Sequence, residues 1–262
     1  MPAPFPAFEY SPGRLDAGVL FVCDHASNAL PPEFGTLGLE PESFDRHIAY
    51  DIGAADVTRH WARAFGAPAV LSTFSRLLID PNRGGDDPTL VMKISDGAII
   101  PGNVDADDAE IARRTALYWQ PYRAAIAAAI EAMLEAGPAP AVVSLHSFTP
   151  AWKGRARPWH VGVLWDSDPR LPAPFMAALR ADPGIVCGDN EPYDGALEGD
   201  VIDAMATRRG LANVLIEIRQ DLVATPAGAV SWARRLEAPL RAALACPGVH
   251  ERRPFGSRAR PG

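Results

Sequence analysis

Short apolar runs alternate with longer segments of helical periodicity along most of the chain. Five runs have the continuous apolar character of buried strands: Val19–Cys23, Ala69–Phe74, Ala141–Leu145, His160–Leu164 and Asn213–Ile218. Five further segments show helical spacing of apolar positions: Ala49–Phe65, Ala106–Glu135, Pro172–Asp182, Asp200–Arg209 and Ala227–Leu244. Strands that alternate with helices predict a three-layer α/β/α fold with a mainly parallel or mixed central sheet.

Two features interrupt this pattern. Pro121 lies inside the helical segment 106–135, where a missing backbone donor and a steric clash predict a division or kink of the helix. Three long polar segments, 24–47, 75–105 and 146–159, connect the predicted elements. Loops of this length in a compact fold are usually functional or disordered, and the histidines at the start of two of them favour a function.

Two histidines, His25 and His146, stand where apolar runs end. The carboxyl ends of parallel strands meet at one edge of a sheet, so the two imidazoles are expected to lie close together. Imidazole is a common zinc ligand, and catalytic zinc takes three protein ligands and a water. The candidates for the third ligand are Asn28, Asp24 and Asp51. The alternatives are hydrogen-bonded structural histidines and an N-cap role for Asp51.

Arg76 and Arg83 belong to a polar segment that also holds Asp80 and Asn82. An arginine fork binds a carboxylate through two parallel hydrogen bonds, so this segment is a candidate anchor for an acidic substrate. The alternative is a solvated loop with an Asp80–Arg83 surface ion pair.

Glu217 and Arg219 alternate with apolar residues at the end of the last predicted strand. Residues two apart share one face of a strand. A carboxylate on an otherwise apolar strand is costly unless it is paired or functional. Glu217 is therefore either a general base for a metal-activated water or one half of an ion pair with Arg219 or Arg76.

Composition restricts the classes of function. A hydrophobic content of 48% and a charged content of 22% are ordinary for a soluble globular protein. The net charge of −7 and the absence of a basic run argue against a nucleic-acid partner. The sequence shows neither a signal peptide nor an apolar stretch of membrane-spanning length, so we expect a cytoplasmic location. The oligomeric state is left open.

We expect a single domain over 1–262, because a chain of 262 residues suits one large α/β domain. The ends at about 1–12 and 251–262, which are rich in proline or arginine, are expected to be flexible.

The polar clusters, taken in order, resemble the N-formylglutamate amidohydrolase family. The matching segments are Asp24–Asn28, His47–Ala54, Ser75–Arg83, Ile99–Asn103, Leu145–Phe148, Asn190–Tyr193 and Ile216–Leu222. The resemblance implies a phosphorylase/hydrolase-like α/β/α fold related to the zinc carboxypeptidases and aspartoacylases.

The resemblance also implies roles for individual residues. His25 and His146 are similar to zinc-binding histidines, Asn82-Arg83 to the pair that holds a substrate carboxylate, and Glu217 to the general base. The zinc peptidases have His-x-x-Glu where this chain has Asn28. The third ligand therefore stays open between Asn28 and Asp51.

The resulting hypothesis is a metal-dependent amidohydrolase that cleaves the linear amide of a small N-formyl or N-acyl acidic amino acid. Zinc is the expected metal, and another divalent metal is the alternative. Arg76 is expected to stabilise the oxyanion. The remaining candidate substrate contacts are Asn103, Ser147, Tyr193 and Arg219. The alternatives are a hydrolase of another N-acyl amino acid or peptide amide, and a catalytically silent carboxylate-binding protein.

Overall fold

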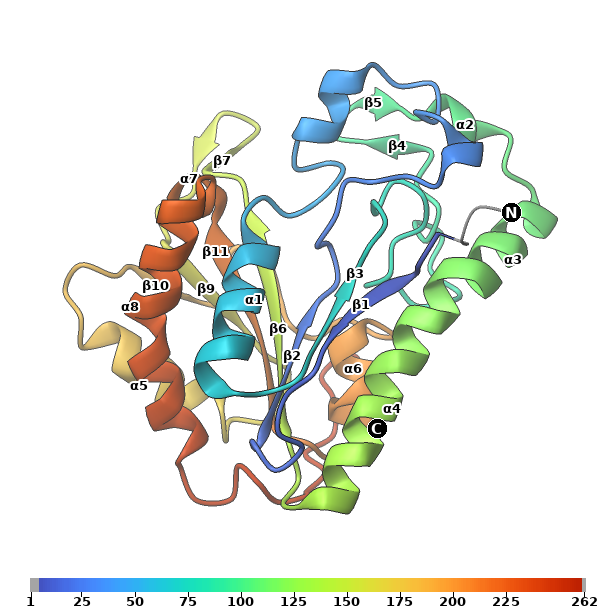
Figure 1. Ribbon diagram of the computed structural model, residues 1–262. Coiled ribbons are helices and arrows are strands. Elements are labelled where there is room, and N and C mark those ends of the chain that lie inside the picture. Colours follow the sequence, from blue (N-terminus) through green and yellow to red (C-terminus); the bar gives the residue numbers. More distant parts are fainter. Residues whose placement is uncertain (1–4, 261–262) are drawn as a thin grey trace.

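The computed structural model describes residues 5–260, which form a seven-stranded mixed sheet between helical layers (Figure 1). The strands lie in the order β1 (Phe8–Ser11), β3 (Ala69–Ser72), β2 (Val19–Cys23), β6 (Ala141–Phe148), β11 (Asn213–Arg219), β9 (Val161–Leu164) and β10 (Cys187–Asp189). The four strands β3, β2, β6 and β11 are parallel. Strand β1 is antiparallel to β3, and the pair β9 and β10 is antiparallel to β11. The predicted fold class is confirmed.

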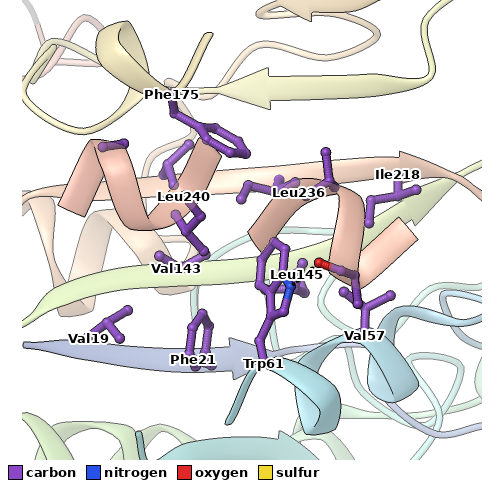
Figure 2. Close-up of a cluster of buried hydrophobic side chains, with 14 of the residues drawn as sticks. Val19, Phe21, Val57, Trp61, Val143, Leu145, Phe175, Ile218, Leu236 and Leu240 are labelled. Atoms are coloured by element: carbon purple, nitrogen blue, oxygen red, sulfur yellow. Dashed lines mark hydrogen bonds between the residues drawn. The ribbon is translucent and has the colours of Figure 1, made fainter. Parts of the chain in front are cut away.

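Helices cover both faces of the sheet. One face carries α1 (Ala54–Phe65), α5 (Pro172–Arg180), α7 (Gln220–Val223) and α8 (Pro226–Leu244), and the other carries α3 (Asp108–Arg114), α4 (Gln120–Ala136) and α6 (Val201–Met205) (Figure 1). Because side chains alternate along a strand, Phe21 packs with Trp61 on the α1 side (Figure 2). Leu20 belongs to the apolar cluster on the α4 side. Both faces of β2 are buried, which explains its uninterrupted apolar sequence.

The predicted elements agree with the structure except for the bounds of some elements and two short strands of the central sheet that were not predicted. Strand β2 has the predicted bounds, β3 ends two residues early, and β6 continues to Phe148. Strands β1 and β10 were not predicted, because they are short and carry no apolar run. The long helical segment is divided, as Pro121 predicts, by a π-helical stretch, Thr115–Trp119, between α3 and α4.

The three long connections contain short elements of their own. Segments 24–53 and 73–107 hold the 3-10 helices Pro32–Phe34 and Pro41–Asp45, the hairpin β4 (Ile94–Ser95) and β5 (Ala98–Ile99), and α2 (Pro101–Val104). They pack on each other around a small apolar cluster that includes Leu37 and Ile100. The third connection forms the hairpin β7 (Ala151–Trp152) and β8 (Arg155–Ala156), and a 3-10 helix, Thr207–Arg209, follows α6.

The described parts of both ends contact the rest of the fold. Residues 8–11 pair with β3 along its full length. Near the other end, Arg258 donates to Asp194 at 2.7 Å, and Arg260 donates to Asp203 at 2.7 Å. The exposed Asp194 and the buried Asp203 therefore hold the arginine-rich tail, while residues 1–4 and 261–262 lie outside the described part. Among residues 5–260, no helix has both the length and the apolar character needed to cross a membrane.

Candidate active site

A pocket of about 430 Å³ lies where the carboxyl ends of β2, β6 and β11 meet the long connections. His25 follows β2, His146 lies in β6, and Glu217 lies beside His146 on the neighbouring strand β11. All three side chains line the pocket and are nearly inaccessible to solvent. The parallel arrangement of β2 and β6 therefore brings the two predicted histidines to one site, with ring centroids 4.9 Å apart.

His25, His146 and Asp51 form a cluster of three possible metal ligands. One donor atom from each lies within 4.8 Å of the others. The Oδ2 atom of Asp51 is 2.8 Å from Nδ1 of His146 and 3.3 Å from Nδ1 of His25. The backbone amide of Asp51 donates to the carbonyl of His25 at 2.9 Å, which ties the connecting loop to the end of β2.

A glycine allows Asp51 to enter this cluster. Gly53 has a φ of 79° and caps α1, so the N-cap role considered for Asp51 is wrong. A Cβ atom at Gly53 would lie 2.1 Å from the carbonyl oxygen of Val223, so only glycine fits this turn. The turn leaves the Asp51 side chain directed to the histidines.

The second nitrogen of each imidazole faces another buried carboxylate. Nε2 of His25 is 2.7 Å from Oδ1 of Asp80, and Nε2 of His146 is 2.9 Å from Oδ2 of Asp24. A carboxylate at Nε2 favours a proton on that nitrogen, so Nδ1 is the nitrogen that a bound metal would take as its ligand. Both imidazoles direct Nδ1 toward Asp51, an arrangement that fits a metal centre.

Asp24 is a partner of His146 rather than a third ligand in the described geometry. Its carboxylate also accepts hydrogen bonds from Tyr122 Oη and Ser144 Oγ, both at 2.8 Å. Burial opposes ionisation of Asp24, but the hydrogen bond and charge of His146 lower its pKa below the usual value. For Asp51 likewise, the two histidines outweigh burial and hold its pKa well below the ordinary range.

Arg76 links two of these carboxylates. Its Nη2 donates to Oδ2 of Asp80 at 2.8 Å, and its Nη1 lies 3.7 Å from Oδ1 of Asp51. Asp80 is completely buried and pairs with Arg76 and His25, so the alternative Asp80–Arg83 surface pair does not form. Arg76 itself lines the pocket with about a fifth of its side chain exposed, which leaves part of its guanidinium accessible.

Glu217 has an unusual environment for a carboxylate. It is 6% exposed, and its Oε2 atom has no hydrogen-bond partner in the described chain. Loss of hydration raises the pKa of Glu217 to about 7. Neither of the alternative ion pairs, with Arg219 or with Arg76, is present within 4 Å among residues 5–260. A buried carboxyl group aimed into a pocket and titrating near neutrality is suited to accept and return a proton.

Several predicted substrate contacts also line the pocket. The Asn82 side-chain oxygen accepts a hydrogen bond from the Val201 amide at 3.0 Å, which fixes the orientation of its amide group. Arg83 has only a distant acidic neighbour, Asp87 at 3.9 Å. Tyr193, which is 43% exposed, lies at the rim. Ser147 donates through Oγ to the Ile52 carbonyl at 2.8 Å and so supports the loop that carries Asp51.

Three predicted site residues, Asn28, Asn103 and Arg219, lie outside the pocket lining. The Asn28 side chain donates to the Phe44 carbonyl at 2.8 Å and supports the adjacent loop. Asn103 is fully buried, donates to the carbonyls of Leu77 and Met92, and accepts from Arg114. The contacts of Asn103 stabilise the connection 73–107. No residue of 95–103 lines the pocket.

Arg219 is turned away by the short helix that follows its strand. Strand β11 ends at Arg219, and α7 brings Asp221 within 2.8 Å of its Nε. Its Nη1 donates to the carbonyl of Arg157 at 3.3 Å. The shared strand face with Glu217 was therefore not sufficient to direct Arg219 into the pocket.

Several pocket residues were not predicted as functional, among them Asp80, His47 and Asp200. Asp80 lies in the arginine-containing segment, where it was considered only as a surface ion-pair partner of Arg83. His47, to which the sequence assigned no role, lines the pocket with Nε2 4.0 Å from Asp96. Burial raises the pKa of Asp200, which lines the pocket and caps α6, to about 7. Only the Asp–Pro–Asn–Arg sequence at 80–83 offered a usable signal.

A mixed sheet between helical layers, with two histidines, a carboxylate and a buried glutamate in one pocket, is typical of hydrolytic enzymes. The family model of N-formylglutamate amidohydrolase matches residues 17–224. The chain belongs to this family and is an amidohydrolase. The match covers β2 through α7 and so contains every residue of the histidine–carboxylate cluster.

Solved structures have the same fold. A gene product of Agrobacterium tumefaciens is 36% identical, with a TM-score of 0.84, and the alignment covers 91% of this chain and 95% of that chain. An N-formylglutamate amidohydrolase from Ralstonia eutropha JMP134 is 24% identical, with a TM-score of 0.68, over 90% of this chain and 97% of that chain. No curated protein matches the chain.

Proposed function

We propose that the enzyme is a metal-dependent hydrolase of the linear amide in a small N-formyl or N-acyl acidic amino acid, such as N-formylglutamate. The observation that carries this proposal is the convergence of His25, Asp51 and His146 beside the unpaired carboxyl group of Glu217. Membership of the N-formylglutamate amidohydrolase family supports the choice of substrate.

The donor set fits a divalent metal, and zinc in particular. His25 and His146 would each contribute Nδ1 and Asp51 would contribute Oδ2, which are the nitrogen and oxygen ligands of a catalytic zinc site. When bound, the metal supplies a Lewis acid for the amide carbonyl and lowers the pKa of water. Asp24 and Asp80 hold the two imidazoles for this purpose through Nε2.

Glu217 performs the proton transfers. Its carboxylate takes a proton from the attacking water as the new C–O bond forms at the carbonyl carbon. It then delivers this proton to the amide nitrogen as the C–N bond breaks, which releases the carboxylic acid and the amine. The raised pKa of Glu217, about 7, makes both transfers favourable near neutral pH.

Arginines bind the negative groups. Arg76, fixed by Asp80, presents the rest of its guanidinium to the oxyanion that develops during attack. Arg83 and the amide group of Asn82 bind the α-carboxylate of the substrate. Local positive charge thus attracts an acidic substrate although the chain carries a net charge of −7.

The test is release of formate from N-formylglutamate by protein that has been depleted of metal and then reconstituted with zinc. We expect hydrolysis with zinc and less than a tenth of it without metal. A parallel screen of other N-formyl and N-acetyl amino acids separates this substrate class from other N-acyl amino acids. Binding of N-formylglutamate without turnover under every metal condition would instead identify a carboxylate-binding protein.

A further inference from the structure

Arg157 follows the β7–β8 hairpin, which lies at the same end of the molecule as the β4–β5 hairpin (Figure 1). Its guanidinium carbon lies 5.0 Å from the ring centroid of Tyr193, 5.6 Å from that of Trp152 and 5.9 Å from that of Phe148. Tyr193 and Phe148 line the pocket. Three aromatic rings, two of which line the pocket, therefore hold the guanidinium next to it through cation–π contacts.

Hydrogen bonds fix Arg157 further. Its Nη1 donates to the Thr149 hydroxyl at 3.0 Å and to the Tyr193 hydroxyl at 3.1 Å, with a longer contact of 3.5 Å to the Thr149 carbonyl. Its backbone amide donates to Pro150 at 2.8 Å, and its carbonyl accepts from Arg219. The side chain is held from both its backbone and its tip, so its orientation is built into the fold.

The guanidinium has no acidic partner in the described chain. No carboxylate lies within 4 Å of Arg157 among residues 5–260, and only Nη1 of its fork has protein acceptors. Arg76, by comparison, is engaged by Asp80 and lies near Asp51. Arg157 thus keeps unused donors in the planar arrangement that matches a carboxylate.

We propose that Arg157 binds the second carboxylate of the substrate and so selects N-acyl derivatives of dicarboxylic amino acids. This inference rests on the proposed function, in which Asn82 and Arg83 bind the α-carboxylate. Arg83 lines the pocket, and Arg157 bonds to its lining residues Thr149 and Tyr193. Among residues 5–260 neither arginine has a carboxylate closer than 3.9 Å, so one is available for each acidic group of such a substrate. The side-chain carboxylate of the substrate would then be the acidic partner that Arg157 lacks.

The test compares N-formylglutamate with N-formylglutamine, which has nearly the same shape but a neutral side chain. We expect the wild type to have a kcat/KM at least about tenfold higher for N-formylglutamate, as one charge-assisted pair implies. Arg157→Gln should lower kcat/KM for N-formylglutamate about tenfold or more and change kcat/KM for N-formylglutamine less than about threefold. Arg157→Lys keeps the charge but not the forked arrangement of donors, so its kcat/KM for N-formylglutamate should lie between those of the wild type and Arg157→Gln. Arg155→Gln, on the exposed β8 strand, is the matched control and should leave both values unchanged.

Binding provides a readout that does not require turnover. Calorimetry should show that the wild type binds glutarate more tightly than glutaramate and that Arg157→Gln binds the two equally. Equal losses on both formyl substrates, or an undiminished preference for the diacid in Arg157→Gln, would overturn the proposal while the proposed function stands. If neither formyl substrate is hydrolysed, the proposed function fails, and the glutarate comparison still decides the role of Arg157.

Discussion

Oδ2 of Asp24 lies 2.9 Å from Nε2 of His146, on the side of the ring opposite the Nδ1 atom that faces Asp51. His146 therefore stands between two buried carboxylates. Its pKa is raised well above the ordinary value because the hydrogen bonds to Asp24 and Asp51 outweigh burial. Asp24 at Nε2 orients the imidazole, whereas Asp51 lies on the Nδ1 side, where a metal would bind. The positioning residue and the proposed metal ligand are thus different carboxylates.

This relationship predicts the effect of Asp24→Asn. The amide cannot hold the Nε2 proton of His146 as strongly, so we expect zinc affinity to fall about 10-fold to 100-fold. Competition with a chromogenic chelator measures the affinity. Asn28→Ala is the matched control, because Asn28 donates to the Phe44 carbonyl and lies outside the pocket lining. A variant of Asp24 with wild-type affinity, or a loss of the same size in Asn28→Ala, would contradict the assigned roles.

Glu217→Gln should abolish proton transfer without disturbing the fold. We expect kcat to fall about 10²-fold to 10⁴-fold while zinc content and the melting temperature stay close to wild type. Steady-state formate release and metal analysis on one preparation test both parts. Glu135→Gln, on an exposed position of α4, should retain full activity. More than a tenth of the wild-type kcat in Glu217→Gln would remove this residue from the mechanism.

Arg83→Gln should weaken substrate binding more than chemistry. The loss of one charge-assisted contact, worth about 1.5–3 kcal/mol, predicts a KM for N-formylglutamate that is roughly 10-fold to 100-fold higher. The value of kcat should change little, since Arg83 does not contact the reacting carbonyl in the proposed arrangement. Arg63→Gln, at an exposed position of α1, serves as the control. An unchanged KM would place the α-carboxylate elsewhere.

Asp200→Asn should change how stability depends on pH. Burial raises the pKa of Asp200 to about 7 from 3.8, so the folded state binds a proton that the unfolded state releases earlier. The associated stability is fully present below about pH 4 and is lost as pH rises to about 7. Each pH unit in this window costs wild type roughly 1.4 kcal/mol that the variant does not lose.

Urea unfolding at pH 5 and pH 8 measures this difference. Asparagine can still cap α6, where the Asp200 carboxylate accepts from the Asp203 amide at 2.6 Å. The variant should therefore gain stability relative to wild type between the two pH values. If the free energy of unfolding falls equally in wild type and variant between pH 5 and pH 8, Asp200 is already ionised at pH 5.

Asn103→Ala tests whether Asn103 is structural. The substitution leaves Arg114 and the carbonyls of Leu77 and Met92 without their buried partner, so we expect a loss of about 3 kcal/mol in the free energy of unfolding. Because Asn103 lies outside the pocket lining, KM of the folded variant should stay within about twofold of wild type. A large rise in KM at unchanged stability would restore the predicted substrate contact.

The main elements were predictable because their sequences report burial directly. Val19–Cys23 is apolar at every position because both of its faces are covered. The direction of β9 was not predictable, since an apolar run is the same for either orientation. Strands β1 and β10 have half-exposed faces and only three or four residues, which leaves no distinctive pattern.

The candidate site was predictable where strands position it and less so where loops do. His25 and His146 follow from the ends of two parallel strands. Asp80 reaches His25 across 55 residues of sequence, through a turn whose geometry no local pattern specifies. Arg219 was misplaced because the helix after β11 introduces Asp221 as a nearer partner. The role of Asp51 stayed open because it depends on the left-handed turn at Gly53.

The most direct measurement is an anomalous difference map from crystals of the zinc-reconstituted enzyme. The proposed centre predicts one strong peak per chain, bonded to Nδ1 of His25, Nδ1 of His146 and Oδ2 of Asp51. A peak bonded to other residues, or no peak in crystals of protein that hydrolyses N-formylglutamate, would contradict it.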